Sequence, residues 1–347
     1  MAHQPDVAID AAGNYVVTWM DNADGSNDVK ARGFAPGYVQ RFATKTLHAD
    51  TTGNQRNPRI DMHTNGDYLI VWEDNAAGTW DAPMRGFRAD ESEWIPQTVA
   101  NTTTEGVQAS PDVAIDGSGR SVVIWEDDAD GNGFYQIKAR GFTATGSQRF
   151  AEMVVNKVAG GDQINPSVDA DAHGYWYAAW EDDGMNGDGY QIGANAFTAA
   201  GARVATDDVR VNHVGSVSAT SGSPARPRRF PIVSAHDSGR YIVIWNDNMD
   251  GDGVFQALAR GITGRSQNLM VKSLYGTVTQ SPAQPFYAPN EVVTLTATPQ
   301  PGYRFVRWSG NVSTTANPIN LTMNGDKLLT AEYEPDPSSS VANWGLY

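Results

Sequence analysis

Short apolar runs recur along the chain at nearly constant spacing, and each run ends in a tryptophan. The runs are YVVTW, YLIVW, SVVIW, WYAAW and YIVIW, and they end at Trp19, Trp72, Trp125, Trp180 and Trp245. Their tryptophans are 53, 53, 55 and 65 residues apart. Apolar residues occupy consecutive rather than alternating positions, so we expect strands that are buried on both faces.

Each apolar run lies inside a longer repeated unit. A unit opens with a proline and a first strand, as in PDVAID, and the opening prolines are Pro5, Pro58, Pro111, Pro166 and Pro231. A glycine turn, the tryptophan run, an acidic turn, a third segment such as ARGF and a variable fourth segment follow. Each unit therefore predicts four short strands connected by turns.

Four-stranded units with both faces covered, repeated along the chain, are typical of β-propeller blades. We predict an all-β protein in which residues 1–273 form a five-bladed β-propeller. A solenoid is the alternative, although solenoid repeats are usually shorter. No later strand visibly completes the first blade, so we expect a closed ring that depends on packing between blades. The repeats resemble those of large secreted or surface proteins of bacteria.

A different module follows at residues 274–335. Its segments VTLTATPQPGYRFVRWSG, NP and TAEY closely resemble the divergent InlB-type B-repeat, a small β-grasp-like module of bacterial surface proteins. One departure is Asn290-Glu291, where that family often has glycine. The resemblance implies an extracellular spacer or adhesion module without catalysis. Residues 336–347 are expected to be a linker or tail.

Composition narrows the classes of partner and compartment. The formal net charge of −15 argues against nucleic acid, because phosphate binding needs a basic surface. The chain has no cysteine, which excludes disulfides and thiolate metal sites. No apolar stretch is long enough for a transmembrane segment. No signal peptide precedes the first strand, so we expect a mature or trimmed form of an extracellular or cell-surface protein.

The turns after the tryptophans carry oxygen ligands at alternate positions. Blade 3 reads DDADGNGFYQ and blade 5 reads NDNMDGDGVFQ, which resemble D-x-D-G-D-G-x-x-D, the calcium loop of integrin-type propeller blades and dockerin-like modules. Calcium takes six to eight oxygens, and glycine allows the sharp turn that makes them converge. The blade 2 turn has Ala77 at the key position and is excluded.

We therefore predict a calcium site in at least one of four turns. The candidate ligands are Asp21, Asn22 and Asp24; Asp128, Asp130 and Asn132; Asp183, Asn186 and Asp188; and Asn248, Asp250 and Asp252. The alternative is that these residues are simply turn formers, which a hairpin between two strands needs.

Other side chains are candidates for ligand contact. The five aligned tryptophans are expected in the core, whereas further aromatic residues are freer to stack on a sugar: Trp80, Phe134, Tyr135, Trp176, Tyr190 and Phe255. A basic cluster, Arg226, Arg228 and Arg229, lies in the one large insertion of an acidic chain. It predicts either ion pairs with neighbouring carboxylates or the binding of an anionic uronate or sulfate group.

One column of the first strands holds Asp10, His63, Asp116, Asp171 and His236. Such residues can perform acid–base chemistry, but each also precedes a tight turn, where aspartate commonly caps the backbone. The histidines lack the spacing of a transition-metal site. We assign no catalytic residue from the sequence.

The preferred function is a non-enzymatic extracellular or cell-surface binding protein, because repeated blades offer repeated weak sites for a multivalent polysaccharide or glycan. A polysaccharide-active enzyme, either lyase or glycosidase, is the first alternative. A purely structural segment of an adhesin or sheath is the second. Near-equal blades favour the binding protein, and fold alone does not decide.

Overall fold

We describe the protein from a computed structural model. The structure describes residues 2–23, 25–49, 52–158, 160–185, 190–212, 228–237, 239–247, 255–263, 267, 269–284, 287, 291–324 and 327–337. The chain divides into two compact units, Met1–Ile262 and Thr263–Tyr347. The described residues include no helix with the length and hydrophobicity that crossing a bilayer requires.

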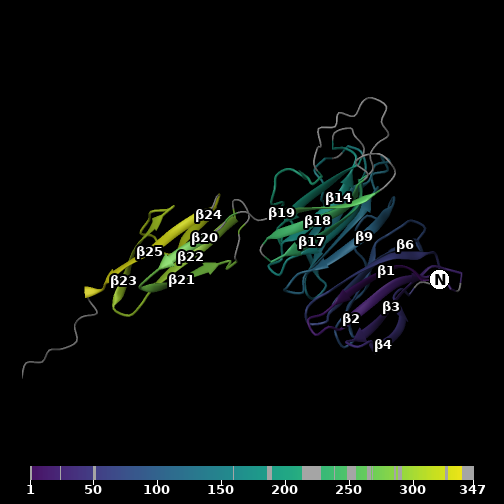
Figure 1. Ribbon diagram of the computed structural model, residues 1–347, viewed down its shortest axis with the longest axis horizontal. Helices are drawn as coiled ribbons and strands as arrows, with labels where there is room; N and C mark the ends of the chain where they lie inside the picture. Colours follow the sequence, from purple (N-terminus) through teal and green to yellow (C-terminus); the bar gives the residue numbers. More distant parts are fainter. Residues whose placement is uncertain are drawn as a thin grey trace, which may run out of the picture. The chain divides into compact units, whose positions relative to one another are not determined.

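The N-terminal unit is a five-bladed β-propeller whose antiparallel sheets follow one another in chain order (Figure 1). Blade 1 comprises β1 (Ala2–Ile9), β2 (Tyr15–Asp21), β3 (Asp28–Ala35) and β4 (Val39–Thr46). Blade 2 comprises β5 (Gln55–Met62), β6 (Tyr68–Asp74), β7 (Pro83–Phe87) and β8 (Glu93–Val99). Blade 3 comprises β9 (Gln108–Ile115), β10 (Ser121–Asp127), β11 (Gln136–Phe142) and β12 (Gln148–Val154).

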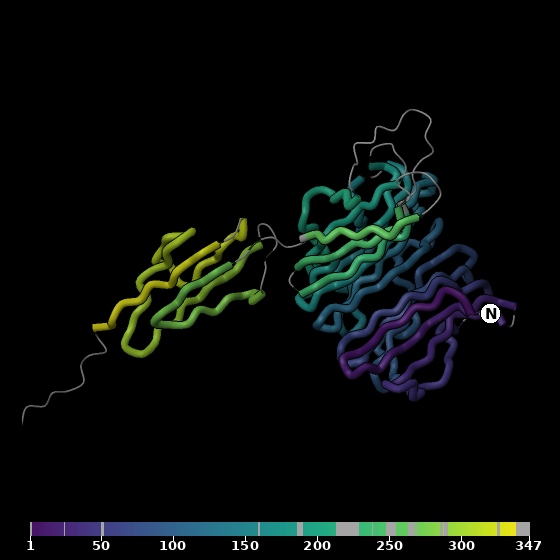
Figure 2. The backbone as a smooth tube through the Cα atoms, in the orientation of Figure 1, coloured from purple at the N-terminus to yellow at the C-terminus, as the bar shows by residue number. Residues whose placement is uncertain are grey.

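Blade 4 comprises β13 (Gln163–Ala170), β14 (Trp176–Asp182), β15 (Gln191–Phe197) and β16 (Val209–Arg210). Blade 5 comprises β17 (Arg228–His236), β18 (Arg240–Asp247) and β19 (Gln256–Thr263). The first strands of consecutive blades contact each other, from β1 and β5 through to β13 and β17. Figure 2 shows the same succession from purple blade 1 to green blade 5. The predicted all-β propeller is thereby confirmed.

The core of this unit lies between successive blades. In β6, Leu69 and Val71 belong to a cluster shared with blade 3, whereas Ile70 and Trp72 belong to one shared with blade 1. All seven residues of β6 are buried. Consecutive apolar positions therefore serve two interfaces at once, as the run YLIVW predicts.

The aligned tryptophans occupy these interfaces. Trp72, Trp125 and Trp180 have 0% exposure, and Trp245 has 5%. Each of the first three belongs to a cluster that also contains residues of the preceding blade. Trp19 of blade 1 is only half-buried. The prediction that these tryptophans form the core is confirmed for four of the five.

The exception reflects the two ends of the blade series. In blade 1, Val7 is 59% and Ile9 is 63% exposed, although their counterparts in blades 2 and 3 are buried. In blade 5, Ile242 and Ile244 on the opposite face are 39% and 41% exposed. A packed ring would bury these two faces together. The expectation of a ring closed by packing between blades 5 and 1 is therefore not met in the described residues.

The boundary between the units also differs from the expectation of residue 273. The strand β20 (Leu269–Ser273) lies within the range predicted for the propeller, but it pairs in parallel with β25 (Lys327–Pro335). Among the described residues, blade 5 consequently has three strands rather than four. Leu269 and Val271 occupy alternate positions of β20 and pack against the core of the second unit. For this reason β20 belongs to the second unit rather than to blade 5.

The C-terminal unit is the predicted small β domain. Its further strands are β21 (Gly276–Ser281), β22 (Glu291–Pro299), β23 (Tyr303–Gly310) and β24 (Ile319–Met323). They form two three-stranded sheets, in the orders β20-β25-β23 and β21-β22-β24. Trp308 and Tyr287, both fully buried, lie in one core with residues of both sheets.

The interface tryptophans generate a stability prediction with an internal control. We expect Trp125→Ala to lower the free energy of unfolding by about 3–5 kcal/mol, because it leaves a cavity between two blades. Trp19→Ala should cost less than about 2 kcal/mol, since that side chain lacks a covering blade. Urea unfolding of both variants measures the difference, and equal costs would contradict the account of the uncovered face.

Candidate functional site

The residue before each opening proline adopts an unusual backbone conformation. Positive φ angles of 48–55° occur at Gln4, Asn57, Ser110, Asn165 and Phe230. Residues before proline normally prefer extended conformations, and positive φ is uncommon outside glycine. The strand pairing shifts register at the same places, which marks a β-bulge in each first strand. The repeat thus places an equivalent bulge in the first strand of each blade.

A carboxylate from the preceding blade accepts the N–H of three of these bulges. The donor and acceptor pairs are Ser110 and Glu73 at 2.8 Å, Asn165 and Glu126 at 2.6 Å, and Phe230 and Glu181 at 2.7 Å. The acceptors are the glutamates that follow the repeat tryptophans. In blade 1 the corresponding residue is Met20, and the side chain of Gln4 accepts from the N–H of Asn57 instead, at 2.9 Å.

A second set of carboxylates bonds along the first strands themselves. Each accepts a backbone N–H from the next blade: Ile60 to Asp6 at 3.0 Å, Ile115 to Asp61 at 2.6 Å, Val168 to Asp112 at 2.9 Å, and Ala235 to Asp169 at 2.7 Å. The acceptor alternates between the first and the third position after the opening proline. Every junction from blade 1 to blade 5 therefore contains at least one charge-assisted bond.

Burial of these carboxylates changes their acidity. Desolvation raises the pKa of Asp61 to about 7, and the neighbouring Asp169 and Asp112 add to the shift. Burial likewise raises the pKa of Asp112 to about 6 and of Glu126 to about 7. For Glu126, the charges of Glu73 and Glu181 contribute in the same direction. The blade junctions are thus sensitive to pH near neutrality.

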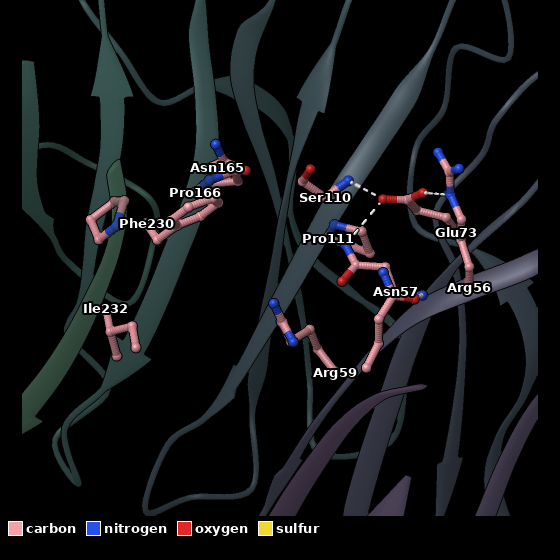
Figure 3. Close-up of a pocket in the computed structure, with 12 residues that line it drawn as sticks. Arg56, Asn57, Arg59, Glu73, Ser110, Pro111, Asn165, Pro166, Phe230 and Ile232 are labelled. Atoms are coloured by element: carbon pink, nitrogen blue, oxygen red, sulfur yellow. Dashed lines mark hydrogen bonds and ion pairs between the residues drawn. The ribbon is translucent and has the colours of Figure 1, made fainter. Parts of the chain in front are cut away.

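The five bulges surround a pocket of about 440 Å³ (Figure 3). Besides the bulge residues, its lining includes Arg56, Arg59, Glu73 and Ile232. Arg56 donates from Nε to Glu73 at 2.6 Å, and its guanidinium lies 3.9 Å from the centre of the Trp80 ring. Trp80, predicted as a ligand contact, thus packs against a residue of this pocket.

The predicted calcium turn of blade 3 is held together by its own hydrogen bonds. Asp128 Oδ1 accepts from the N–H of Gly133 at 3.3 Å, and Asp130 accepts from the backbone and side chain of Asn132. Asn132 in turn accepts from Phe134 at 2.7 Å. These bonds are typical of turn-forming residues. Where the structure describes the chain, it groups no three His, Asp or Glu side chains as metal ligands.

The other acidic turns are described in part. In blade 1, Asp21 forms an ion pair with Lys30 at 3.0 Å and accepts from the N–H of Ala23, and the carbonyl of Asn22 accepts from Gly25. In blade 4, Asp183 accepts from the N–H of Asp162. The remaining candidates lie outside the described residues: Asp24, Asn186, Asp188, Asn248, Asp250 and Asp252. Calcium binding stays a prediction.

The other ligand candidates do not form one site. Phe134 and Phe255 are each 47% exposed, and Tyr135 and Tyr190 are half-buried. Of the described residues that line the central pocket, none belongs to this group. Burial, together with the carboxylates of Asp162, Asp183 and Glu181, raises the pKa of Tyr190 to about 12.

Trp176 requires a correction. It was predicted to be free for a ligand, but its side chain is fully buried and stacks between Phe150 and Phe197. The reason is its place at the start of a doubly buried strand. In the basic cluster, Arg229 is exposed, the side chain of Arg228 is not described, and Arg226 lies outside the described residues.

The Asp and His column of the first strands serves the turns that follow it. Asp10 accepts from the N–H of Ala12 and Asn14, and Asp116 and Asp171 make the equivalent pairs of bonds. This pattern is the backbone capping that was considered for these aspartates beside acid–base chemistry. The sequence analysis did not identify the pocket itself, although the proline at each bulge was visible as a repeat marker.

Comparison with known proteins identifies one of the two units. Residues 269–337 match the model of the divergent InlB B-repeat domain, which begins before the boundary expected from the sequence and includes β20. No curated protein matches the chain.

Solved structures resemble the chain at low identity. A Dyadobacter fermentans protein of unknown function is 10% identical, with a TM-score of 0.50 over 86% of this chain and 91% of that chain. A thermostable family-43 glycoside hydrolase is 14% identical, with a TM-score of 0.42 over 75% and 89% of the two chains. An endo-arabinase from Bacteroides thetaiotaomicron is 12% identical, with a TM-score of 0.41 over 75% and 93%. The first likeness indicates a shared fold and nothing about a ligand.

Titration of Glu126 predicts how the stability of the protein depends on pH. Its pKa is raised in the folded protein, so its contribution to stability is complete below its ordinary value near 4.5 and is lost as the pH rises through about 7. Glu126→Gln keeps an oxygen for the N–H of Asn165 and removes the charge. Between pH 4.5 and 8, the free energy of unfolding should therefore fall by on the order of 1–3 kcal/mol less in the variant than in the wild type.

Unfolding by urea at a series of pH values measures this decline. Glu105→Gln, at an exposed side chain, is the matched control and should follow the wild-type curve. A Glu126→Gln profile parallel to the wild type across the same range would show that the residue does not titrate there.

The blade 3 turn gives a prediction for metal removal. If calcium binds at Asp128, Asp130 and Asn132, a hundredfold excess over Kd should raise the free energy of unfolding by about 2.7 kcal/mol. The melting temperature should then be higher in calcium than in EDTA. Asp130→Ala should abolish the increase, whereas Glu105→Ala should retain it. Equal melting temperatures in calcium and EDTA would leave these residues as ordinary hairpin turns.

Proposed function

We propose that this chain is the glycan-binding part of an extracellular or cell-surface protein, and that the pocket between the five bulges receives the saccharide. The observation that carries the proposal is the pocket itself. Each blade contributes its bulge residue to one cavity of about 440 Å³, which lies within the size range of small-ligand sites.

The chemistry of the lining suits a sugar. The side-chain amides of Asn57 and Asn165 donate to Glu73 and Glu181, and no donor among the described residues engages their oxygens. Those oxygens can accept from hydroxyl groups. Phe230 and Ile232, which are 56% and 61% exposed, provide apolar surface for the C–H faces of a pyranose ring. Saccharides need this combination of polar and apolar contacts.

Binding is favoured over hydrolysis by the state of the carboxylates. A glycosidase places two carboxyl groups on either side of the scissile bond. Glu126 and Glu181 are 8% and 0% exposed, and each accepts the N–H of a bulge. Among the described residues that line the pocket, Glu73 is the one carboxylate. The glutamates are thus committed to structure.

The second unit supports the location. Its match to the divergent InlB B-repeat domain fits a spacer or adhesion module outside the cell, and the absence of cysteine is compatible with that compartment. Calcium at the blade 3 turn, if it binds, would stabilise the blade rather than contact the sugar, since Asp128, Asp130 and Asn132 do not line the pocket. A chain with net charge −15 is also suited to a partner other than nucleic acid.

A glycan array with a variant that fills the pocket tests the proposal. We expect the wild type to bind a set of oligosaccharides, and Ile232→Trp to weaken their binding more than tenfold by occupying the cavity. Ile244→Trp is the matched control, because Ile244 is also an exposed isoleucine of blade 5 but does not line the pocket. Binding that survives Ile232→Trp, or that fails equally in both variants, would place the ligand elsewhere.

A further inference from the structure

Arg59 departs from the pattern of the repeat. It occupies the position directly after an opening proline, where blades 1 and 3 have Asp6 and Asp112. In those blades the aspartate accepts a backbone N–H of the next blade. Arg59 has no acceptor with which to make that bond, and blade 2 bonds to blade 3 through Asp61, two residues later. The junction is therefore complete without Arg59.

The guanidinium of Arg59 is directed into the pocket. Figure 3 shows it extending into the space between Pro111 and Ile232. It has no hydrogen-bond or ion-pair partner among the described residues. The neighbouring Asp112, whose pKa Arg59 lowers, already accepts from the N–H groups of Val113 and Val168. Arg59 is thus a half-buried cation whose donors remain available to a ligand.

The other charges of the lining compensate each other. Arg56 donates to Glu73, and Glu73 also accepts from Asn57 and Ser110. Their charges cancel, which leaves the guanidinium of Arg59 as the excess charge of the lining. A positive site inside a chain of net charge −15 indicates a ligand that carries a negative group.

We propose that Arg59 makes this pocket selective for an acidic saccharide, a hexuronate whose carboxylate pairs with the guanidinium. This inference rests on the proposed function of the pocket. A guanidinium binds a planar carboxylate through two parallel N–H donors, which fixes the orientation of the sugar as well as its charge. The same geometry does not arise with the hydroxymethyl group that a neutral hexose carries at that position.

Titration calorimetry with a trimer of galacturonic acid and the matching trimer of galactose tests the inference. We expect wild-type protein to bind the acidic trimer at least tenfold more tightly. Arg59→Gln should remove this preference and retain binding of the neutral trimer, and Arg59→Lys should keep a part of it. Arg32→Gln, which removes the same charge from a residue outside the pocket lining, should behave as wild type.

The outcomes separate the two proposals. Equal binding of both trimers by wild type, or an acidic preference that persists in Arg59→Gln, overturns the role of Arg59 and leaves a glycan pocket in place. A preference lost equally in Arg32→Gln overturns it as well, since net charge would then explain the effect. Failure of both trimers to bind overturns the acidic ligand, and a glycan array without any bound saccharide overturns the pocket's proposed function too.

Discussion

The architecture of the propeller depends on one interaction, a hydrogen bond from a backbone N–H of one blade to a buried side-chain carboxylate of the blade before it. Four such bonds connect the first strands, and three more, from Glu73, Glu126 and Glu181, bind the bulges. A bulge frees a backbone donor from the sheet, and a buried donor without an acceptor would be costly. The carboxylate satisfies the donor and fixes the neighbouring blade at the same time.

The same interaction explains where the series of blades ends. In blade 5 the positions that carry the carboxylate are Ile232 and Ser234, and the glutamate position is Asn246. The apolar face of blade 5 beside them is exposed, as is the face of blade 1 that would receive it. Hydrophobic packing and carboxylate bonding therefore stop at the same place, because both belong to one repeated interface.

Much of this fold could be predicted from the sequence because the repeat is strongly periodic. The tryptophan runs predicted that both faces of each second strand are buried, and the opening prolines predicted where each blade begins. The unit boundary could not be placed, because Leu269 and Val271 read equally well as a last propeller strand or as a first strand of the next unit. Trp176 was misjudged because its core environment comes from Phe150 and Phe197, which are distant in sequence.

The candidate site was largely hidden from sequence analysis. The acidic turns were recognised by their composition, whereas the bulge residues of the pocket are of four different types and share only the place before a proline. Their positive φ angles and their common orientation exist only in three dimensions. Arg59 could have been noticed as the cation in a column that otherwise holds Asp, Ser and Ile, but without the pocket its position had no chemical meaning.

The central claim is that the cavity between the five bulges is the binding site for a saccharide. A crystal structure of the protein soaked with an oligouronate tests it most directly, because it locates the ligand without reliance on variants. The account predicts electron density for a sugar ring between Phe230 and Asn57, with its carboxylate at the Arg59 guanidinium. Density confined to the acidic turns or to the outer surface of the blades would contradict it.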